Sequence, residues 1–224
     1  MSFDGFTKET ISFLAGLSKH NDKTWFDAHR ADYDAHLLEP AKAFVVALAP
    51  KLRAIDARLH AEPRVNGSIF RINRDTRFSK DKTPYKDHLD LWFWSGKQKG
   101  WDCSGFYFRL TPKLLVLGAG MHDFTPPVLA KYRKAVLDDK KGKRLVEIQR
   151  SLAKAGYRFG GEKYKRPPRG VDESHPRVAL LKYGALFTGW EGKHPKELFT
   201  KRAVDFVIGH YKTLAPVHEW LEAM

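Results

Sequence analysis

Apolar side chains recur every three or four positions through the N-terminal quarter of the chain, which is the spacing of an amphipathic helix. Thr7 is a suitable N-cap for a first helix, and Asn21-Asp22 interrupts the pattern and restarts it. A second helix is expected across residues 25–37, and Pro40 suits the first turn of a third. The chain is therefore expected to begin with three helices.

The period changes from helical to alternating after Asn66-Gly67, a turn signal. Residues 69–78 alternate between apolar and polar, so their polar positions would stand in a row on one face of a strand. Residues 88–94, 105–110 and 113–118 are expected to form further strands, which indicates an antiparallel meander. The apolar side of the first run is Phe70, Ile72 and Phe78, and its polar row is Arg71, Asn73, Asp75 and Arg77.

Helical spacing returns after the strands and is interrupted by a basic loop, rich in proline and glycine, at 160–176. The whole pattern predicts an α+β fold: a single domain over residues 1–224, with a mainly antiparallel sheet of about four to five strands and helices before and after it. The later helices are expected at 126–138, 143–155, 195–210 and 214–222, with a short additional strand near 186–190.

Composition is that of an ordinary globular protein, with 42% hydrophobic and 29% charged residues. The single cysteine, Cys103, allows no disulfide within the chain, so the reducing cytosol is the expected compartment. The first residues lack the basic and apolar regions of a signal peptide, and no apolar run approaches the roughly 18 residues needed to span a bilayer. A cytoplasmic protein without a membrane segment is therefore expected.

Positive charge is concentrated in two parts of the chain, whose net charge is +14. Residues 64–86 hold seven arginines and lysines against two aspartates, and residues 140–170 hold eleven against two glutamates. These windows have net charges of +5 and +9, so the rest of the chain is formally neutral. Two basic segments on a neutral body suggest an acidic partner, whereas the alternative is that both are solvated faces.

Standard catalytic and cofactor signatures are missing from the sequence: there is no GxxxxGK[ST] loop, no GxGxxG after a strand, no HExxH and no paired CxxC. Asp172 and His175 are two candidate metal ligands, but two ligands do not make a site. The alternative is that they organise their loop by capping a helix after Pro176. The sequence thus predicts no metal site and leaves any cofactor unknown.

Aromatic residues could stack nucleic-acid bases, although aromatics at helical or strand spacing more often form a core. Trp92 and Trp94 differ from the others because they share the polar parity of their strand with His88 and Asp90. If that face is open, the two indoles would form a wall beside the basic row. The candidates for stacking are Trp25, Tyr33, Trp92, Trp94, Trp101 and Tyr107.

The stretch RINRDTRFSKDKTPYK, residues 71–86, concentrates charge where loops usually carry glycine, proline, serine and asparagine. An exposed Arg–Asp pair stabilises a protein by only about 0–1 kcal/mol, whereas arginine forks match phosphate or carboxylate groups bidentately. A site for an anion and a structural network of ion pairs both stay open. For an anion site, the catalytic candidates are Asp75 or Asp81 as a general base with a raised pKa, and Tyr107 as a donor. The anion-binding candidates are Arg71, Asn73, Arg74, Arg77, Lys82, Lys86, Arg166, Arg169 and His175.

Four blocks follow one another through the chain: NDKTWFDAHRADYD at 21–34, RINRDTRFSKDKTPYK at 71–86, GFYFRLTPKLLVLGAGMHDFTPPVLAKYR at 105–133 and YKRPPRGVDESHPRVALLKYGALF at 164–187. Together they resemble the DUF2461 family of uncharacterised bacterial and fungal proteins, and the second block is the most specific. One small departure is Val171, where the family pattern leads us to expect an aromatic residue. The resemblance implies a cytoplasmic, single-domain α+β protein, and it implies no activity.

Three functions stay open on the sequence alone. The leading hypothesis is a basic pocket, in an enzyme or a binding protein, that takes a phosphorylated or otherwise anionic small molecule. The second is a nucleic-acid-binding protein, which would present an extended basic surface and bind with strong salt dependence. The third is a non-enzymatic scaffold in which the arginine and aspartate network only stabilises the fold. The sequence does not predict an oligomeric state.

Overall fold

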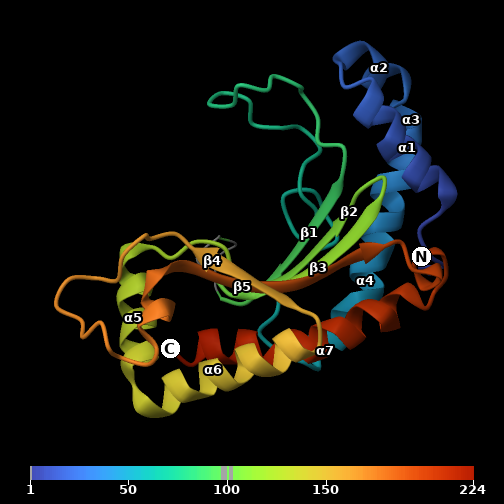
Figure 1. Cartoon of the computed structure of the whole chain (residues 1–224). Helices are drawn as coiled ribbons and strands as arrows, with labels where there is room; N and C mark the ends of the chain where they lie inside the picture. Colours follow the sequence, from blue (N-terminus) through green and yellow to red (C-terminus); the bar gives the residue numbers. More distant parts are fainter. Residues whose placement is uncertain (1, 97–99, 101–102) are drawn as a thin grey trace. The chain divides into compact units, whose positions relative to one another are not determined.

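The structure is a computed structural model that describes residues 2–96, 100 and 103–224 (Figure 1). Its described residues have an α+β fold, in which helices precede and follow one five-stranded antiparallel sheet, as predicted. None of the helices in this part of the chain is long and apolar enough to cross a membrane. The helices are α1 (Lys8–Lys19), α2 (Lys23–Ala28), α3 (Arg30–Asp32), the π-helix η1 (Tyr33–Leu38), α4 (Glu39–Arg53), α5 (Pro126–Leu137), α6 (Asp139–Lys154), the 3-10 helices η2 (Val178–Lys182) and η3 (Lys196–Phe199), and α7 (Ala203–Glu222).

The sheet has the strand order β1-β2-β3-β5-β4. The first three strands are consecutive in the chain and therefore form the predicted meander. β5 follows β3 in the sheet, is longer than the short strand expected near 186–190, and pairs antiparallel with β4, which was not predicted. The bounds are β1 (Leu89–Trp94), β2 (Gly105–Leu110), β3 (Leu114–Met121), β4 (Arg158–Glu162) and β5 (Tyr183–Lys193).

The chain divides into two compact units. Unit 1 contains the described residues of Met1–Phe93 together with Tyr107–Leu117 and Glu191–Gly209. Unit 2 contains the remaining described residues, including α5, α6 and β4.

The N-terminal helices of unit 1 begin where the polar caps predict. The Thr7 side chain accepts a hydrogen bond from the Thr10 amide and the Thr10 hydroxyl accepts one from the Thr7 amide, which is a capping box at the start of α1. Asp22 caps α2 by accepting from the Trp25 amide at 2.9 Å. Behind these helices lies an aromatic core of four phenylalanine rings whose centroids are 5.0–5.8 Å apart: Phe3, Phe6, Phe44 and Phe108.

The expected second helix over residues 25–37 is broken into three pieces. α2 ends at Ala28, α3 covers one turn, and η1 continues as a π-helix into α4. Tyr33 and Leu37 are buried as the apolar stripe predicts, but Trp25 and His29 are only half-buried. In the π-helix the carbonyl of His36 accepts a hydrogen bond from the buried Thr10 hydroxyl at 2.7 Å. A contact from α1 thus satisfies a carbonyl in this wider turn.

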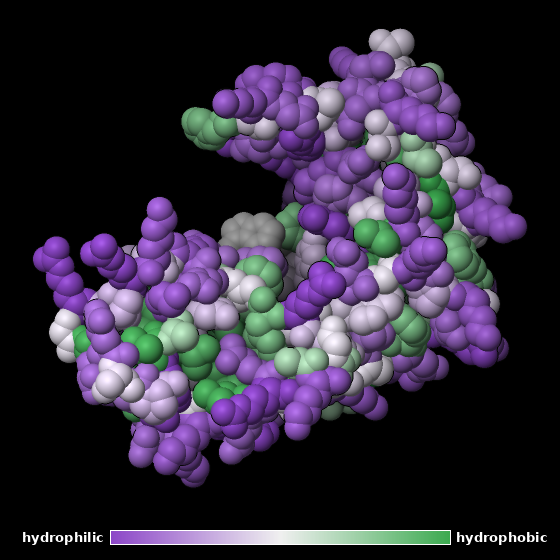
Figure 2. All heavy atoms as spheres, viewed as in Figure 1, coloured by the Kyte–Doolittle hydropathy of each residue, from purple (hydrophilic) through white to green (hydrophobic). Residues whose placement is uncertain are grey.

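The alternating run at 69–78 does not form a regular strand, so that prediction is wrong. Ile69 and Asn73 make isolated bridges: Ile69 pairs antiparallel with Leu91 and parallel with Val65, and Asn73 pairs antiparallel with Tyr85. Residues 74–84 form a loop between the bridged residues Asn73 and Tyr85, and we call this loop the excursion. Its surface is largely hydrophilic in Figure 2. Ile72 is buried, but Phe78, expected on the same side, is 94% exposed.

The two tryptophans of β1 do not form an open aromatic wall. Trp92 and Trp94 are buried along with every other residue of the strand, because β1 is covered on both faces. The expectation of exposed stacking rings is therefore wrong for these two, and Trp101 lies outside the described residues.

In unit 2, two buried residues on α7, Tyr211 and Trp220, pack against Phe106 and Tyr132. The C-terminal region was predicted as helices at 195–210 and 214–222. It is instead the short η3 followed by one continuous helix, α7, with Pro216 inside it. Trp220 Nε1 donates to the carbonyl of Lys141 at 2.8 Å, which ties α7 to α6.

Candidate functional site

A buried carboxylate stands at the centre of a polar cluster in unit 1. Asp90 lies in β1 between Leu89 and Leu91, and only 6% of it is exposed. Tyr107 and Arg109 stand two residues apart on the neighbouring β2 and therefore share one face of the sheet. The Tyr107 hydroxyl donates to Asp90 Oδ1 at 2.8 Å. Arg109 donates from Nε to Oδ1 at 2.7 Å and from Nη2 to Oδ2 at 2.9 Å.

These contacts keep Asp90 ionised. Burial raises the pKa of the Asp90 carboxyl, but hydrogen bonds and charge from His88 and Arg109 outweigh burial, so its pKa lies well below the ordinary value. Burial lowers the pKa of Arg109, and the bonds to Asp90 outweigh this in turn, so its pKa is raised. Asp90 is therefore a fixed anion that orients its neighbours, and it is a poor proton acceptor.

A second chain of polar contacts reaches Asp90 through His88. Ser18 of α1 donates to Asp87 Oδ2 at 3.0 Å, and Asp87 Oδ1 lies 3.0 Å from His88 Nδ1. His88 Nε2 lies 3.2 Å from Asp90 Oδ2. Both imidazole nitrogens thus face carboxylate oxygens, and both contacts are hydrogen bonds only when the ring carries two protons.

Besides Arg109, the cluster contains two further cations, Lys86 and Arg71, whose charge is not neutralised by a carboxylate of the cluster. The Lys86 ammonium lies 4.9 Å from the centroid of the Phe70 ring. Burial lowers its pKa, Asp90 opposes this shift, and Arg109 and Arg71 add to it, so the net pKa is lowered. Among the described residues no carboxylate lies within ion-pair distance of Lys86 or Arg71.

Backbone contacts hold this cluster in place. The Phe70 amide donates to the carbonyl of Asp90 at 3.0 Å, and the Lys86 amide donates to the carbonyl of Ile72 at 2.8 Å. The side-chain amide of Asn21 donates to the Tyr85 carbonyl at 2.9 Å and accepts from the Tyr85 amide at 3.0 Å. The segments on either side of the excursion are therefore anchored close to Asp90.

Three of the four cations of the excursion have local partners. Arg74 contacts Asp81 at 2.5 Å and also donates to the Thr83 hydroxyl. Arg77 makes a two-point contact with Asp75, from Nε at 3.0 Å and from Nη2 at 2.7 Å. Lys82, also expected to bind an anion, donates to the carbonyl of Thr76 at 2.9 Å. This part of the block is a loop stapled by its own polar contacts.

A general base in the excursion was expected to have a raised pKa, and neither Asp75 nor Asp81 has one. The Arg77 side chain and amide bind Asp75 and lower the pKa of its carboxyl to about 2. The Thr83 amide, with Arg74, lowers the pKa of Asp81 to about 2. Tyr107, expected as a donor, donates its hydroxyl hydrogen bond to Asp90 Oδ1. Asn73 is exposed and its backbone forms the bridge to Tyr85.

Three predicted anion ligands belong to unit 2, whereas the cluster around Asp90 belongs to unit 1. Arg166 and Arg169 are exposed, and His175 accepts a hydrogen bond from the Arg177 amide at 3.2 Å. Arg177 was not a predicted site residue. It is buried, with 5% of it exposed, and it donates to the carbonyls of Val136 and Leu137 at the end of α5. The arginine with a structural role in this block is therefore Arg177.

The loop pair Asp172 and His175 does not cap a helix. Asp172 accepts from the Ser174 amide at 2.8 Å and from its hydroxyl at 2.7 Å, which makes a local turn. The following η2 begins without a side-chain cap, so the capping prediction is wrong. Within the described part of the chain, no three histidine, cysteine, aspartate or glutamate side chains are grouped as a metal site requires.

The central residues Asp90, Arg109 and His88 were not among the predicted site residues. Asp90 and His88 were assigned to the polar parity of their strand, and Arg109 has the same parity as Tyr107. The signal that could have found them is a carboxylate and an arginine in adjacent strands of one meander, because cross-strand neighbours pair opposite charges.

Comparison with known proteins gives a family and no activity. A family model described as "Conserved hypothetical protein (DUF2461)" matches residues 9–220, which is nearly the whole chain. No curated protein matches the sequence.

Proposed function

The chain belongs to the DUF2461 family of conserved hypothetical proteins, and from its geometry we propose that it binds a phosphorylated or otherwise anionic small molecule at Arg71, Lys86 and Arg109. The observation that carries the proposal is the crowding of Lys86. Its ammonium is partly removed from water and feels the charge of two arginines, while Asp90, the carboxylate whose charge opposes theirs, is already bound by Arg109. Like charges held together without a counter-ion are costly, and a bound anion would offset that cost.

The same cluster explains how such an anion would be oriented. Arg109 uses Nε and Nη2 to bind Asp90, which leaves Nη1 without an acceptor among the described residues. Lys86 supplies a compact charge, and Arg71 supplies a planar fork on an exposed position. Asp90, Tyr107 and His88 act as positioning residues. We propose no reaction, because the carboxylates at hand are strongly acidic.

Titration with inorganic phosphate at low ionic strength, followed by NMR of the arginine side-chain N–H signals, tests the proposal. We expect Lys86→Gln and Arg71→Gln to weaken phosphate binding by about tenfold or more. Lys80→Gln is the matched control, because it removes the same charge from an exposed position of the excursion, and it should change affinity less than about twofold.

Equal weakening by all three substitutions would mean that phosphate responds only to the general positive field. An absence of saturable binding by the wild type would also reject the proposal.

One observation favours a nucleic-acid partner as the second candidate function. Phe78 is 94% exposed at the far end of the excursion, with the Arg77 guanidinium 5.7 Å from its ring centroid. An exposed ring beside basic groups suits stacking on an unpaired base. A single-stranded oligonucleotide should then bind with affinity that falls steeply with salt, and Phe78→Ala should weaken it. The candidate fails if no electrophoretic shift occurs at low salt.

A further inference from the structure

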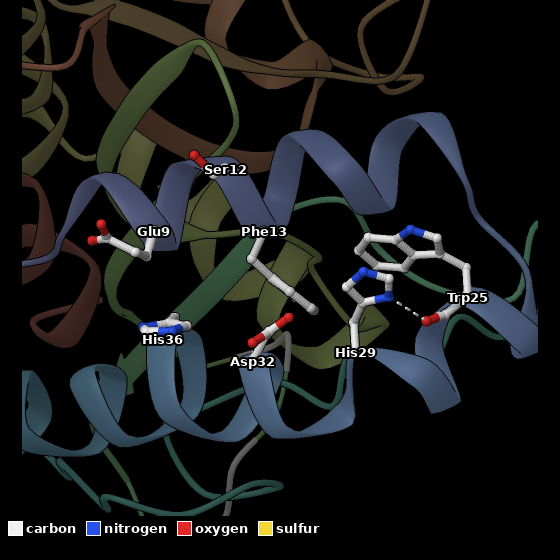
Figure 3. A pocket seen from close by; sticks show the side chains of 7 residues that line it. All are labelled: Glu9, Ser12, Phe13, Trp25, His29, Asp32 and His36. Carbon is white, nitrogen blue, oxygen red and sulfur yellow. Dashed lines mark hydrogen bonds between the residues drawn. The ribbon is translucent and has the colours of Figure 1, made fainter.

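A pocket of about 330 Å³ opens in unit 1 between α1 and the helices that follow it (Figure 3). From α1 it is lined by residues at positions i, i+3 and i+4, and the facing helices contribute residues at i, i+3 and i+7. The first set therefore shares one face of α1, whereas the second set comes from α3, its N-cap and η1. The first set is Glu9, Ser12 and Phe13, and the second is His29, Asp32 and His36.

One end of the pocket is an aromatic wall. The rings of Trp25 and His29 are stacked with centroids 4.0 Å apart and 14° between their planes. The indole lies so close to α1 that a Cβ atom added at Gly16 would be only 2.8 Å from Trp25 Cζ2. His29 Nδ1 donates to the carbonyl of Trp25 at 2.8 Å, so Nε2 of the neutral ring is left as an acceptor. Figure 3 shows both rings together at this end.

The rest of the lining carries two carboxylates, Glu9 and Asp32, beside Ser12, Phe13 and His36, although the protein as a whole has a net charge of +14. Figure 3 shows the carboxylates of Glu9 and Asp32 between the two helix layers, with no lysine or arginine among the labelled lining residues. Among the described residues, neither carboxylate has a lysine or arginine within ion-pair distance. Asp34, the next acidic residue along, is instead paired with Arg30 at 3.5 Å.

We propose that this pocket is a binding site for a small organic cation, such as a primary amine attached to an aromatic or aliphatic group. The stacked rings of Trp25 and His29, together with Phe13, offer an aromatic wall to the organic part of the ligand, and the two carboxylates offer opposite charge to its ammonium group. His29 Nε2 offers an acceptor to an ammonium N–H. A metal ion fits this lining less well, because the described residues include no set of three grouped ligands.

The volume restricts the ligand to a small molecule, since about 330 Å³ is at the lower end of the range for ligand pockets. The ligand's charge is opposite in sign to that expected at Arg71 and Lys86. The pocket is therefore a second site with its own ligand class, and it does not depend on the proposed anion site.

Titration with benzylamine, followed by the indole N–H signals in ¹H–¹⁵N NMR spectra, tests the cation site. Benzyl alcohol and benzoate have nearly the same shape and are neutral and anionic, so they measure the contribution of charge directly on the wild-type protein. We expect benzylamine to shift the Trp25 signal in a saturable way, and to bind at least about tenfold more tightly than benzyl alcohol.

Glu9→Gln and Asp32→Asn should each weaken benzylamine binding, whereas the matched control Asp34→Asn should leave it unchanged. Gly16→Leu should clash with the Trp25 indole and displace it, and should therefore reduce binding of both benzylamine and benzyl alcohol. Equal affinity for benzylamine and benzyl alcohol would overturn the proposal. So would benzylamine binding that Asp34→Asn weakens as much as Asp32→Asn does.

Discussion

Arg109 of β2 donates two hydrogen bonds to Asp90 of the neighbouring β1, one to each carboxylate oxygen. Asp90 has lost nearly all contact with water, while 38% of the Arg109 side chain is still accessible. A buried carboxylate held in this way depends on its donors, because an uncompensated charge in the interior is costly. The pair is therefore the part of unit 1 where a change of one atom should have the largest electrostatic effect.

Asp90→Asn should destabilise the protein by about 2–3 kcal/mol. This is less than the roughly 3–5 kcal/mol typical of a fully buried pair, because water still reaches Arg109. Urea unfolding followed by circular dichroism measures the change. Asp75→Asn, which breaks the exposed contact with Arg77, is the control and should leave the urea midpoint unchanged. If the two variants were equally stable, Asp90 would contribute nothing through its charge.

The pH dependence of stability should follow the same carboxylate. Its pKa is lower in the folded protein than the value near 3.9 of an unfolded aspartate, so the folded state binds fewer protons than the unfolded state. The resulting stability is fully present above about pH 5 and is lost as the pH falls through the folded pKa. Asp75 and Asp81, with pKa values of about 2, act in the same direction, but solvent screens both.

Urea midpoints of the wild type and Asp90→Asn should therefore converge as the pH is lowered from about 5 to 2, because asparagine cannot titrate. A difference between the two proteins that stays constant over this range would contradict the assignment of the lowered pKa to Asp90.

Ile72 and Phe78 should respond oppositely to truncation, although they share one parity in the sequence. Ile72 is buried beside the bridge at Asn73, so Ile72→Ala should cost about 2–4 kcal/mol. Phe78 is exposed, so Phe78→Ala should leave thermal stability unchanged. Differential scanning calorimetry of the two variants separates them. A large loss for Phe78→Ala would show that its ring packs against the protein in solution.

Two glycines provide a test of backbone requirements in opposite directions. Gly120 of β3 has φ +141°, and a Cβ there would clash with the backbone of β5 at Leu186 and Phe187, so Gly120→Ala should destabilise strongly, by about 2–4 kcal/mol. Gly209 is exposed within α7, with open space around its Cα, so Gly209→Ala should stabilise by about 0.5–1 kcal/mol. Urea midpoints that move in the same direction would contradict this account.

The elements that sequence reasoning found are those that local chemistry decides. Thr7 and Asp22 cap their helices through their own side chains, so a short window contains the whole signal. The first strands of the meander follow from their alternation and from the turn near Thr111, whose hydroxyl bonds to Lys113 and Leu114. These features need no knowledge of distant residues.

The elements that sequence reasoning missed depend on distant partners. β4 carries Gly160 and Gly161, which disfavour a strand on their own, and it exists because β5 offers a partner. Residues 69–78 alternate as a strand does, but among the described residues no β-bridge follows the one at Asn73, and only the Arg74 amide still donates across to the Pro84 carbonyl, at 2.8 Å. The gap expected between helices at 195–210 and 214–222 does not exist, because Tyr211 and Trp220 pack along one continuous helix, α7.

The predicted site residues were likewise found from local signals, and the missed ones depend on contacts between distant residues. Charge density marks the block 71–86, and two of its members, Arg71 and Lys86, influence the ionisation of the central cluster. Asp90 and Arg109 were missed as a pair because their contact depends on the register of two strands, which alternation alone does not specify. The pocket beside Trp25 was missed because it requires two helices to face each other.

Asn21 binds both backbone groups of Tyr85 and thereby takes the place of a neighbouring strand at the base of the excursion. The length of the excursion can consequently change without moving Lys86. Residues could be inserted or deleted between Thr76 and Lys82 while the amide of Asn21 and the bridge at Asn73 keep Tyr85, and hence Lys86, in register. The tip can thus change in length while the charge beside Asp90 keeps its place.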